Sequence, residues 1–269
     1  VERQHAIESW DEYKAHGHRV VKFVPASGAA SRMFKDLFGF LTAKYDTPTT
    51  EFEHKFFDNI PHFAFREALC DQCKKNNGKG VRALLKEEKY KDVVANLLEE
   101  KGLNYGQLPK GLLLFHAYAD GARTPMEEHL VEAALHFTVS HEHLPLFRKK
   151  VEDCIAKYEA KYDIKINVSF SEQKPSTDTI AVNTDNTPFR NDDGSLLFRP
   201  GGHGALIENL NDIDADVVFI KNIDNVVPDR LKGDTVLYKN VLAGVLVENQ
   251  KRAFEYLELL DSGNYNHKD

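Results

Sequence analysis

Residues 20–33 read Val20-Val21-Lys22-Phe23-Val24-Pro25-Ala26-Ser27-Gly28-Ala29-Ala30-Ser31-Arg32-Met33. An apolar run typical of a strand ends in small residues, and a hydroxyl, an arginine and helix-forming residues follow. Such a strand–loop–helix unit often holds a phosphate, because bare side chains let the ligand reach backbone N–H groups and a helix N-terminus favours negative charge. The candidate loop consists of Ala26, Ser27, Gly28, Ala29, Ala30, Ser31 and Arg32. Small residues also serve plain helix–strand packing, so the loop alone leaves both interpretations open.

Strand and helix patterns alternate along the rest of the chain. Apolar periodicity predicts helices over 1–19, 31–44, 125–137, 146–162 and 205–210, and strands over 20–25, 112–115, 164–170, 180–182 and 216–225. Residues 51–105 are mostly helical in pattern, with an aromatic stripe typical of a core, and we interpret them as a helical insertion that covers the sheet. Alternation of this kind predicts one α/β domain over 1–269, with a mainly parallel central sheet and helices on both faces.

Composition bounds the function. The chain has 269 residues, 42% of them hydrophobic, with a net charge of −7 and a pI near 6.0. It can bury a sizeable core, but it lacks the basic surface that a nucleic-acid partner requires. No apolar run is long enough for a membrane span and no signal-peptide pattern opens the chain, so we expect a cytoplasmic protein without membrane contact. The first residue is Val1, which is consistent with a processed, trimmed or partial chain.

The three cysteines predict no disulfide framework. Cys70 and Cys73 have the spacing of a CxxC motif, but a zinc site needs a second ligand pair and only His62 lies nearby in sequence. We therefore interpret them as reduced thiols on a helix.

Asp224 is the main candidate for a metal ligand. It follows the apolar strand pattern of 216–223, where a carboxylate is costly unless it is paired or bound to a cation. Mg²⁺ is usually held by one or two carboxylates, with phosphate oxygens and water completing its shell. The alternative is a strand-end aspartate that caps the next element. Asn222 and Asn225 would orient the substrate or the metal's water molecules, or would serve the turn.

Three further motifs suit a phosphorylated ligand. Arg199-Pro200-Gly201-Gly202-His203-Gly204 is a loop whose glycines allow close backbone approach, and we favour ligand contact over a structural role for His203. Lys110 lies between Pro109 and Gly111, which indicates a positioned cation, although a surface amine fits equally well. Gln173 follows a predicted strand, and its amide offers both a donor and an acceptor to a base edge.

The order of these motifs resembles that of the UDP-sugar pyrophosphorylases. A small-residue loop with Ser-Arg, then Pro-Lys-Gly, a glutamine at a strand end, Pro-Gly-Gly-His-Gly and Asn-Ile-Asp-Asn follow one another over residues 20–227. That family, which includes UDP-glucose and UDP-N-acetylhexosamine pyrophosphorylases, has a GT-A-like, Rossmann-like nucleotidyltransferase fold. The resemblance points to a bacterial branch of the nucleotide-diphospho-sugar transferase superfamily.

The resemblance implies roles for these residues. Residues 26–32 are similar to the nucleotide loop, Lys110 to the lysine that meets phosphate, and Asp224 to the Mg²⁺ ligand. Gln173 and Gly202 resemble uracil contacts, with Gly201 beside them, and His203 resembles the histidine near the sugar phosphate. Two features depart from the family. Ser27 and Ala30 stand where glycines are usual, and residues 226–269 are too few for the family's sugar-binding strands, so we expect that part to be missing.

The sequence thus predicts an enzyme that joins UTP, or another NTP, to a sugar 1-phosphate and releases pyrophosphate, with Mg²⁺ as cofactor. Arg32 and Lys110 would offset negative charge on the pyrophosphate, and Asp224 would hold the metal. One rival is a glycosyltransferase that uses a nucleotide sugar. Another is a catalytically silent module that binds nucleotide or nucleotide sugar. A dinucleotide-dependent dehydrogenase is disfavoured, because no GxGxxG follows the first strand.

Overall fold

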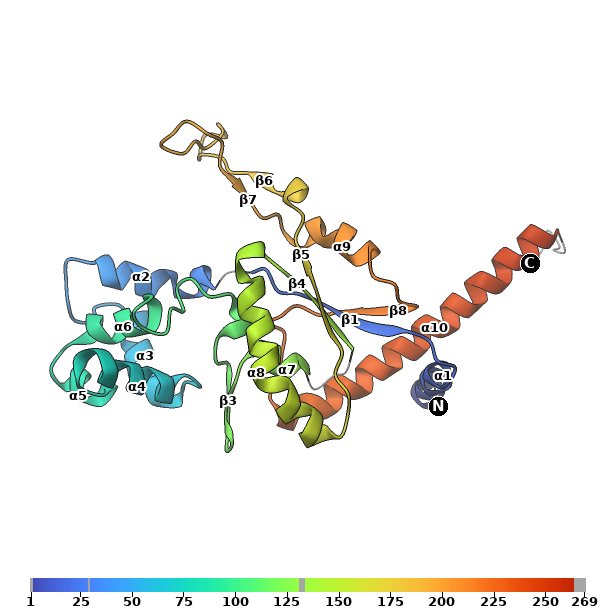
Figure 1. The fold of residues 1–269 in the computed structure, drawn as a ribbon, viewed down its shortest axis with the longest axis horizontal. Coiled ribbons are helices and arrows are strands. Elements are labelled where there is room, and N and C mark those ends of the chain that lie inside the picture. The colour runs from blue at the N-terminus through green and yellow to red at the C-terminus, as the bar shows by residue number, and fades with distance from the viewer. Residues whose placement is uncertain (1, 29, 131–133, 264–269) are drawn as a thin grey trace. The chain divides into compact units, whose positions relative to one another are not determined.

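The computed structural model describes residues 2–28, 30–130 and 134–263 (Figure 1). Within these ranges the helices are α1 Glu2–Ala15, α2 Lys35–Thr42, α3 Glu51–Asn59, α4 Arg66–Asn77, α5 Val81–Lys86, α6 Tyr90–Leu98, α7 Pro125–Leu130, α8 Leu144–Tyr162, α9 Ile207–Asn211 and α10 Lys232–Ser262. The strands are β1 Val20–Pro25, β2 His116–Tyr118, β3 Gly121–Arg123, β4 Leu135–Val139, β5 Val168–Glu172, β6 Thr179–Ile180, β7 Phe198–Arg199 and β8 Val217–Ile220.

The central sheet has four strands in the order β5-β4-β1-β8. Strand β4 pairs in parallel with β1, where Phe23 lies opposite His136, and with β5, where Phe170 lies opposite Phe137. On the other side of β1, the backbone N–H of Lys221 donates to the Phe23 carbonyl at 3.1 Å. The chain therefore forms the predicted α/β fold with a parallel sheet. Its strands run in one direction, so their carboxyl ends share one edge, where ligands bind in such folds.

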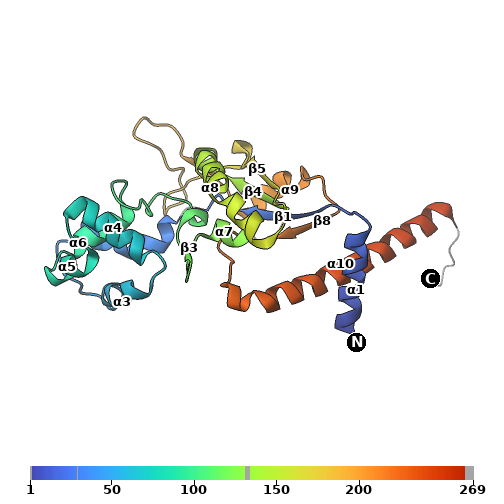
Figure 2. The ribbon, with the colours of Figure 1, turned by 60° about the horizontal axis from the view of Figure 1, so that its bottom comes forward.

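Helices cover both faces of this sheet, as predicted. On one face, α7 and α8 bury Phe137, Phe147 and Tyr158 in a common core (Figures 1 and 2). On the opposite face the side-chain amide of Asn209, on α9, donates to the Ser171 hydroxyl at 3.1 Å and to the Glu172 carbonyl at 2.9 Å. The two faces differ because alternate residues of β4 and β5 are apolar on one side and polar on the other.

The predicted helical insertion is the run α3–α6, but the prediction that it covers the sheet was wrong, because within the described residues its buried side chains form a core with α2 that contains no residue of the central strands. Thr50 caps α3 through a capping box with Glu53, and Gly78 ends α4 in a left-handed conformation. The aromatic stripe is core, as predicted, because Phe56 and Phe57 are buried with leucines and valines of α4–α6 and with α2. This second core belongs to the same compact unit as the sheet, residues 21–214 and 218–226.

Residues 2–20, 215–217 and 227–263 form a second compact unit. In it α1 packs against α10, and the crossing depends on Gly244, because a Cβ at this position would clash with the backbone of Ala6. The single domain predicted over 1–269 stays a prediction.

Several predicted boundaries were wrong. Of the helix predicted over 125–137, the structure describes residues 125–130 as α7, whereas 135–139 form the central strand β4, because Leu135, Phe137 and Val139 alternate with His136 and Thr138 as a strand requires. The turn predicted to enter a short strand within 108–115 is present at 110–112, but the strand itself starts only at His116, in a hairpin with β3. Residues 179–180 pair with β7 in a separate antiparallel hairpin, not in the central sheet.

Candidate functional site

The small-residue loop leaves β1 at the carboxyl edge of the sheet. The N–H of Ala26 donates to the Thr138 carbonyl at 2.8 Å, which continues the β1–β4 pairing past the strand. The loop is then bound to a distant segment, because the N–H of Lys110 donates to the Gly28 carbonyl at 3.2 Å and the N–H of Ala30 donates to the Leu108 carbonyl at 3.4 Å. Beyond it, Ser31–Phe34 form a short 3-10 turn that leads into α2.

Lys110 lies beside Asp224. Its Nζ is 2.7 Å from Asp224 Oδ2, and both side chains are partly exposed. The Pro-Lys-Gly motif explains this contact, because a Cβ on Gly111 would lie 2.8 Å from the Phe147 ring and 2.9 Å from the Ile223 side chain. Glycine is needed for this close approach, which brings the neighbouring lysine to the carboxylate. Ile223 is itself held to β1, since its N–H donates to the Pro25 carbonyl at 3.2 Å.

The charge of Asp224 is stabilised at this position. Burial alone would raise the pKa of its carboxyl group, but the hydrogen bond and positive charge of Lys110 lower the pKa overall, with a smaller contribution from His203. The carboxylate is therefore ionised at neutral pH.

Gln173 fixes the glycine-rich loop of residues 199–204 from the side of β5. Its Nε2 donates to the Gly201 carbonyl at 3.2 Å, and the residue is 8% exposed. Its Oε1 is buried and accepts no hydrogen bond within residues 2–28, 30–130 and 134–263. A buried amide oxygen without a donor is costly, and such groups occur at binding sites. Gly202 has a φ of −68° and open space around its Cα, so its backbone faces no steric restriction.

The other predicted site residues are mostly exposed and make few contacts. Arg32 and Ser31 are exposed, and Arg32 forms no hydrogen bond or ion pair with another described residue. Asn222 and Asn225 form a turn through a backbone hydrogen bond of 3.1 Å, and both are exposed. Ala29 lies outside the described residues. The structure thus joins Gly28, Lys110 and Asp224 by direct contacts after β1, and it joins Gln173 to Gly201 after β5.

Asp224 would be a single protein ligand for Mg²⁺. Within the described residues no group of three or more His, Cys, Asp and Glu side chains is arranged around a metal position. One carboxylate is sufficient when substrate phosphates and water supply the other oxygens. The donor set therefore fits a magnesium ion that arrives with a phosphorylated ligand, provided that Lys110 shares Asp224 with it or moves.

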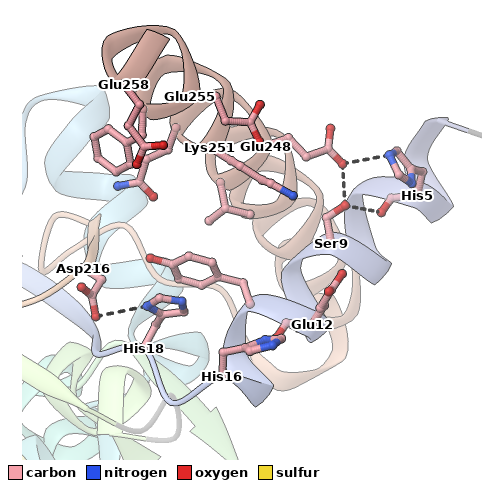
Figure 3. A pocket seen from close by; sticks show the side chains of 14 residues that line it. His5, Ser9, Glu12, His16, His18, Asp216, Glu248, Lys251, Glu255 and Glu258 are labelled. Carbon is pink, nitrogen blue, oxygen red and sulfur yellow. Dashed lines mark hydrogen bonds and ion pairs between the residues drawn. The ribbon is translucent and has the colours of Figure 1, made fainter. Parts of the chain in front are cut away.

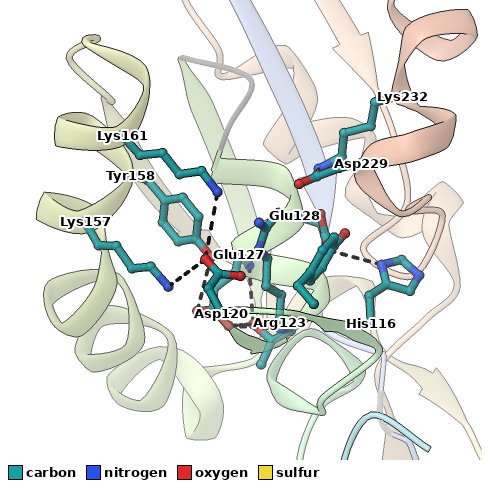
Figure 4. Close-up of polar contacts among 12 residues, drawn as sticks. His116, Asp120, Arg123, Glu127, Glu128, Lys157, Tyr158, Lys161, Asp229 and Lys232 are labelled. Carbon is teal, nitrogen blue, oxygen red and sulfur yellow. Dashed lines mark hydrogen bonds and ion pairs between the residues drawn. The ribbon is translucent and has the colours of Figure 1, made fainter. Parts of the chain in front are cut away.

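An ionic cluster that joins the β2–β3 hairpin to α7 and α8 was not predicted (Figure 4). Glu128, on α7, accepts a hydrogen bond from the Tyr118 hydroxyl at 2.6 Å and lies 3.1 Å from the Nδ1 of His116. Its neighbour Glu127 forms a capping box with Thr124, and Lys150 Nζ lies 3.0 Å from a Glu127 carboxylate oxygen. The signal in the sequence was Arg123-Thr124-Pro125-Met126-Glu127-Glu128-His129, a dense group of charges next to apolar residues.

The same helix supports the candidate site. His129 is fully buried on α7, and its Nε2 lies 3.1 Å from the Ile223 carbonyl. A carbonyl only accepts, so Nε2 carries the proton and donates. The cluster is thereby connected to the residue that precedes Asp224.

The α1–α10 unit has a cavity of about 670 Å³ (Figure 3). Glu248 Oε1 accepts from the Ser9 hydroxyl at 2.5 Å and lies 3.2 Å from His5, and His18 stacks on Tyr13. Its lining includes Glu12, Asp216, Glu255 and Glu258 as well. The cavity lining also holds Lys251 and three histidines, but its five carboxylates outnumber that one lysine and disfavour phosphate, so the sheet edge remains the candidate site for a phosphorylated ligand.

No helix in the part of the chain that the structure describes is both long and apolar enough to cross a membrane. In comparisons with known proteins, a family model described as "Domain of unknown function (DUF4301)" matches residues 1–269. No curated protein and no solved structure matches.

Proposed function

The chain belongs to the DUF4301 family, and from the geometry of its sheet edge we propose that it is a nucleotidyltransferase. In this proposal an NTP, with UTP as first candidate, reacts with a sugar 1-phosphate to give a nucleotide sugar and pyrophosphate. The observation that carries the proposal is the contact between Lys110 and Asp224 at 2.7 Å, next to the loop that follows β1, to which the Lys110 N–H donates.

The chemistry requires position and charge compensation more than proton transfer. A phosphate oxygen of the sugar 1-phosphate attacks the α-phosphorus, a new P–O bond forms, and the bond between the α- and β-phosphates breaks. The electron pair stays on the departing pyrophosphate, whose negative charge Lys110 and Arg32 offset. No general base is needed, because the attacking phosphate is already anionic.

Other residues would hold the substrates. The backbone N–H groups of residues 27, 28, 31 and 32 would meet the nucleotide phosphates, since those of Ala26 and Ala30 already donate to the Thr138 and Leu108 carbonyls. The buried Oε1 of Gln173 would accept from an N–H on the edge of the base. Gly201 and Gly202 would allow the base to approach, and Asn222 and Asn225 would contact the substrate. Magnesium, held by Asp224 and phosphate oxygens, would neutralise charge on the triphosphate. The cytoplasmic location also stays a prediction.

The test is a pyrophosphate-release screen of the four NTPs against a panel of sugar 1-phosphates. We expect release with at least one pair, and its loss in Lys110→Ala. Lys149→Ala is the matched control, because Lys149 also forms an ion pair with an aspartate, Asp153, at 3.0 Å but lies on α8.

The rivals give different results in the same assay. A glycosyltransferase would consume nucleotide sugar in the presence of an acceptor and release no pyrophosphate. A silent module would bind UTP in a titration but turn over no pair. Either result contradicts the proposed reaction.

A further inference from the structure

We propose that an aromatic pocket next to the phosphate-binding residues binds an apolar group of a phosphorylated ligand. The pocket has a volume of about 300 Å³ and lies within the larger unit, between the helical insertion and the segment after Lys110. Its lining includes Met33, Phe52, Phe65, Phe115 and Ala64. Tyr105 is the one polar side chain in this lining among the described residues. The inference rests on the phosphate-binding part of the proposed function.

The chain leads from the candidate site directly into this pocket. Arg32 is followed by Met33 and Phe34, and Lys110 is followed, three residues later, by Leu113; all three apolar residues line the pocket. The two segments are held together just before they enter the pocket, by the bonds from Lys110 N to Gly28 O and from Ala30 N to Leu108 O. A phosphate bound by these segments therefore has the pocket beside it.

The pocket's surface is unusual for a core. Met33 is 47% exposed and Phe52 is 42% exposed, although both lie next to buried aromatic rings. An exposed apolar patch of this kind often marks a ligand or partner site. The neighbouring exposed residue, Arg32, is a cation without an ion-pair partner in the described residues. An apolar cavity with a cation at its border complements a molecule that joins an apolar group to an anion.

The small volume of the pocket suits one group of a ligand better than a whole ligand. Pockets that hold a whole small molecule usually span about 300–1,000 Å³, so this one is at the lower limit. The Tyr105 hydroxyl accepts a hydrogen bond from the Leu114 N–H at 3.2 Å and still has its own proton to donate. An alkyl, acyl or aryl group of moderate size fits these conditions, with the phosphate outside the pocket.

The experiment compares the affinities of octyl phosphate, phenyl phosphate and inorganic phosphate, measured by calorimetry below the micelle concentration. We expect one of the two apolar probes to bind at least about tenfold more tightly than inorganic phosphate, because each buried methylene contributes roughly fourfold in affinity. The octyl arm supports a chain and the phenyl arm supports a ring. Arg32→Ala should weaken binding of all three probes.

Two variants test the pocket itself. Ala64→Trp fills it from the wall and should remove the advantage of the apolar probe, while inorganic phosphate binds as before. Met33→Gln removes an exposed apolar contact with little change in shape, and should lower the advantage several-fold even if Ala64→Trp fails to fold. Leu146→Gln is the control, because Leu146 is 43% exposed on α8 and does not line the pocket.

Equal affinity of the wild-type protein for all three probes would overturn the inference. So would an advantage that survives unchanged in Met33→Gln and in any folded Ala64→Trp. The readout is binding alone, so a chain that turns over no NTP and sugar phosphate would contradict the proposed function while leaving this inference intact.

Discussion

The contact between Lys110 and Asp224 joins two residues that are 114 positions apart in sequence. Each lies beside a residue that packs tightly: Gly111 contacts Phe147 and Ile223, and Ile223 is bonded to β1. The ion pair is partly exposed, so its contribution to stability is small. Its importance is that it presents a cation and an anion together where the strands end.

At this scale we predict the effect of removing the cation. In Lys110→Met the pKa of Asp224 should rise, because burial then acts on the carboxyl group without the hydrogen bond that now lowers it. Affinity for UTP should fall about ten- to a hundredfold, as expected for a lost charge-assisted hydrogen bond of roughly 1.5–3 kcal/mol, and affinity for uridine should change little. NMR titration and calorimetry measure the two effects. Equal losses for UTP and uridine would argue against a phosphate contact.

At the scale of the elements, two adjacent glycines in the glycine-rich loop before α9 have different surroundings. Gly201 is packed: a Cβ there would lie 2.8 Å from the Thr177 carbonyl oxygen and 2.9 Å from the Ala205 Cβ. Gly202 is open, with nothing within 4 Å and a φ of −68°, which any residue adopts. The two adjacent glycines therefore respond differently to the same substitution.

Gly202→Val should keep the wild-type melting temperature and lose affinity for the nucleotide, because the added side chain occupies space that the ligand needs. Gly201→Val should lower the melting temperature, because the backbone at Thr177 or the turn at Ala205 must move to make room for the side chain. Thermal unfolding and UTP titration of both variants measure the difference. If Gly202→Val binds UTP as the wild type does, no ligand packs against this loop.

The polar face of the sheet also contains a partly buried histidine. His136, on β4, lies 2.8 Å from the hydroxyls of both Ser169 and Ser171, and its ring stacks on Phe23. Burial lowers the pKa of this histidine below its ordinary value of 6.5. The folded state therefore binds a proton less readily than the unfolded state does.

Because the unfolded chain binds more protons, stability should fall as the pH drops from about 7.5 to 5, until the lowered pKa of His136 is reached. His136→Gln should show a flatter dependence over the same range. Chemical denaturation at several pH values measures it, and His141→Gln is the control, since the His141 side chain is 90% exposed. A slope that is the same in wild type and His136→Gln would assign the effect to other groups.

For the molecule as a whole, the two compact units differ in what holds them. The larger unit has the sheet core and the aromatic core of the helical insertion, whereas in the smaller unit α1 packs on α10 at Gly244. Much of α10 remains apolar and exposed, including Leu242 and Tyr256. The two units are therefore expected to differ in resistance to local unfolding.

Gly244→Ala should separate α1 from α10, because the new methyl group meets the backbone of Ala6. Hydrogen exchange should then increase in α1 and α10 and stay unchanged in β1, β4 and β5. Gly233→Ala, on the same helix with nothing within 4 Å, is the matched control and should stabilise α10 by up to about 1 kcal/mol. Loss of protection across the sheet in Gly244→Ala would show that the units unfold together.

Local patterns were sufficient for much of this fold. Strand β1 over 20–25, the capping boxes at Thr50 and Thr124, and the helices of 51–105 all follow from side chains within a few residues of one another. Local patterns also indicated which small, charged and amide residues follow the predicted strands, and their role in binding stays a prediction. These features depend on periodicity and capping, which the sequence displays directly.

Tertiary structure decided the rest. Residues 135–139 become β4 because pairing with β1 on one side and β5 on the other outweighs a helix-like apolar spacing. The partner of Lys110, the bond from His129 to Ile223 and the buried carboxylate of Glu128 all join segments far apart in sequence, which no local pattern encodes. The sequence thus determined which chemical groups are available at the sheet edge, and long-range packing determined which of them meet.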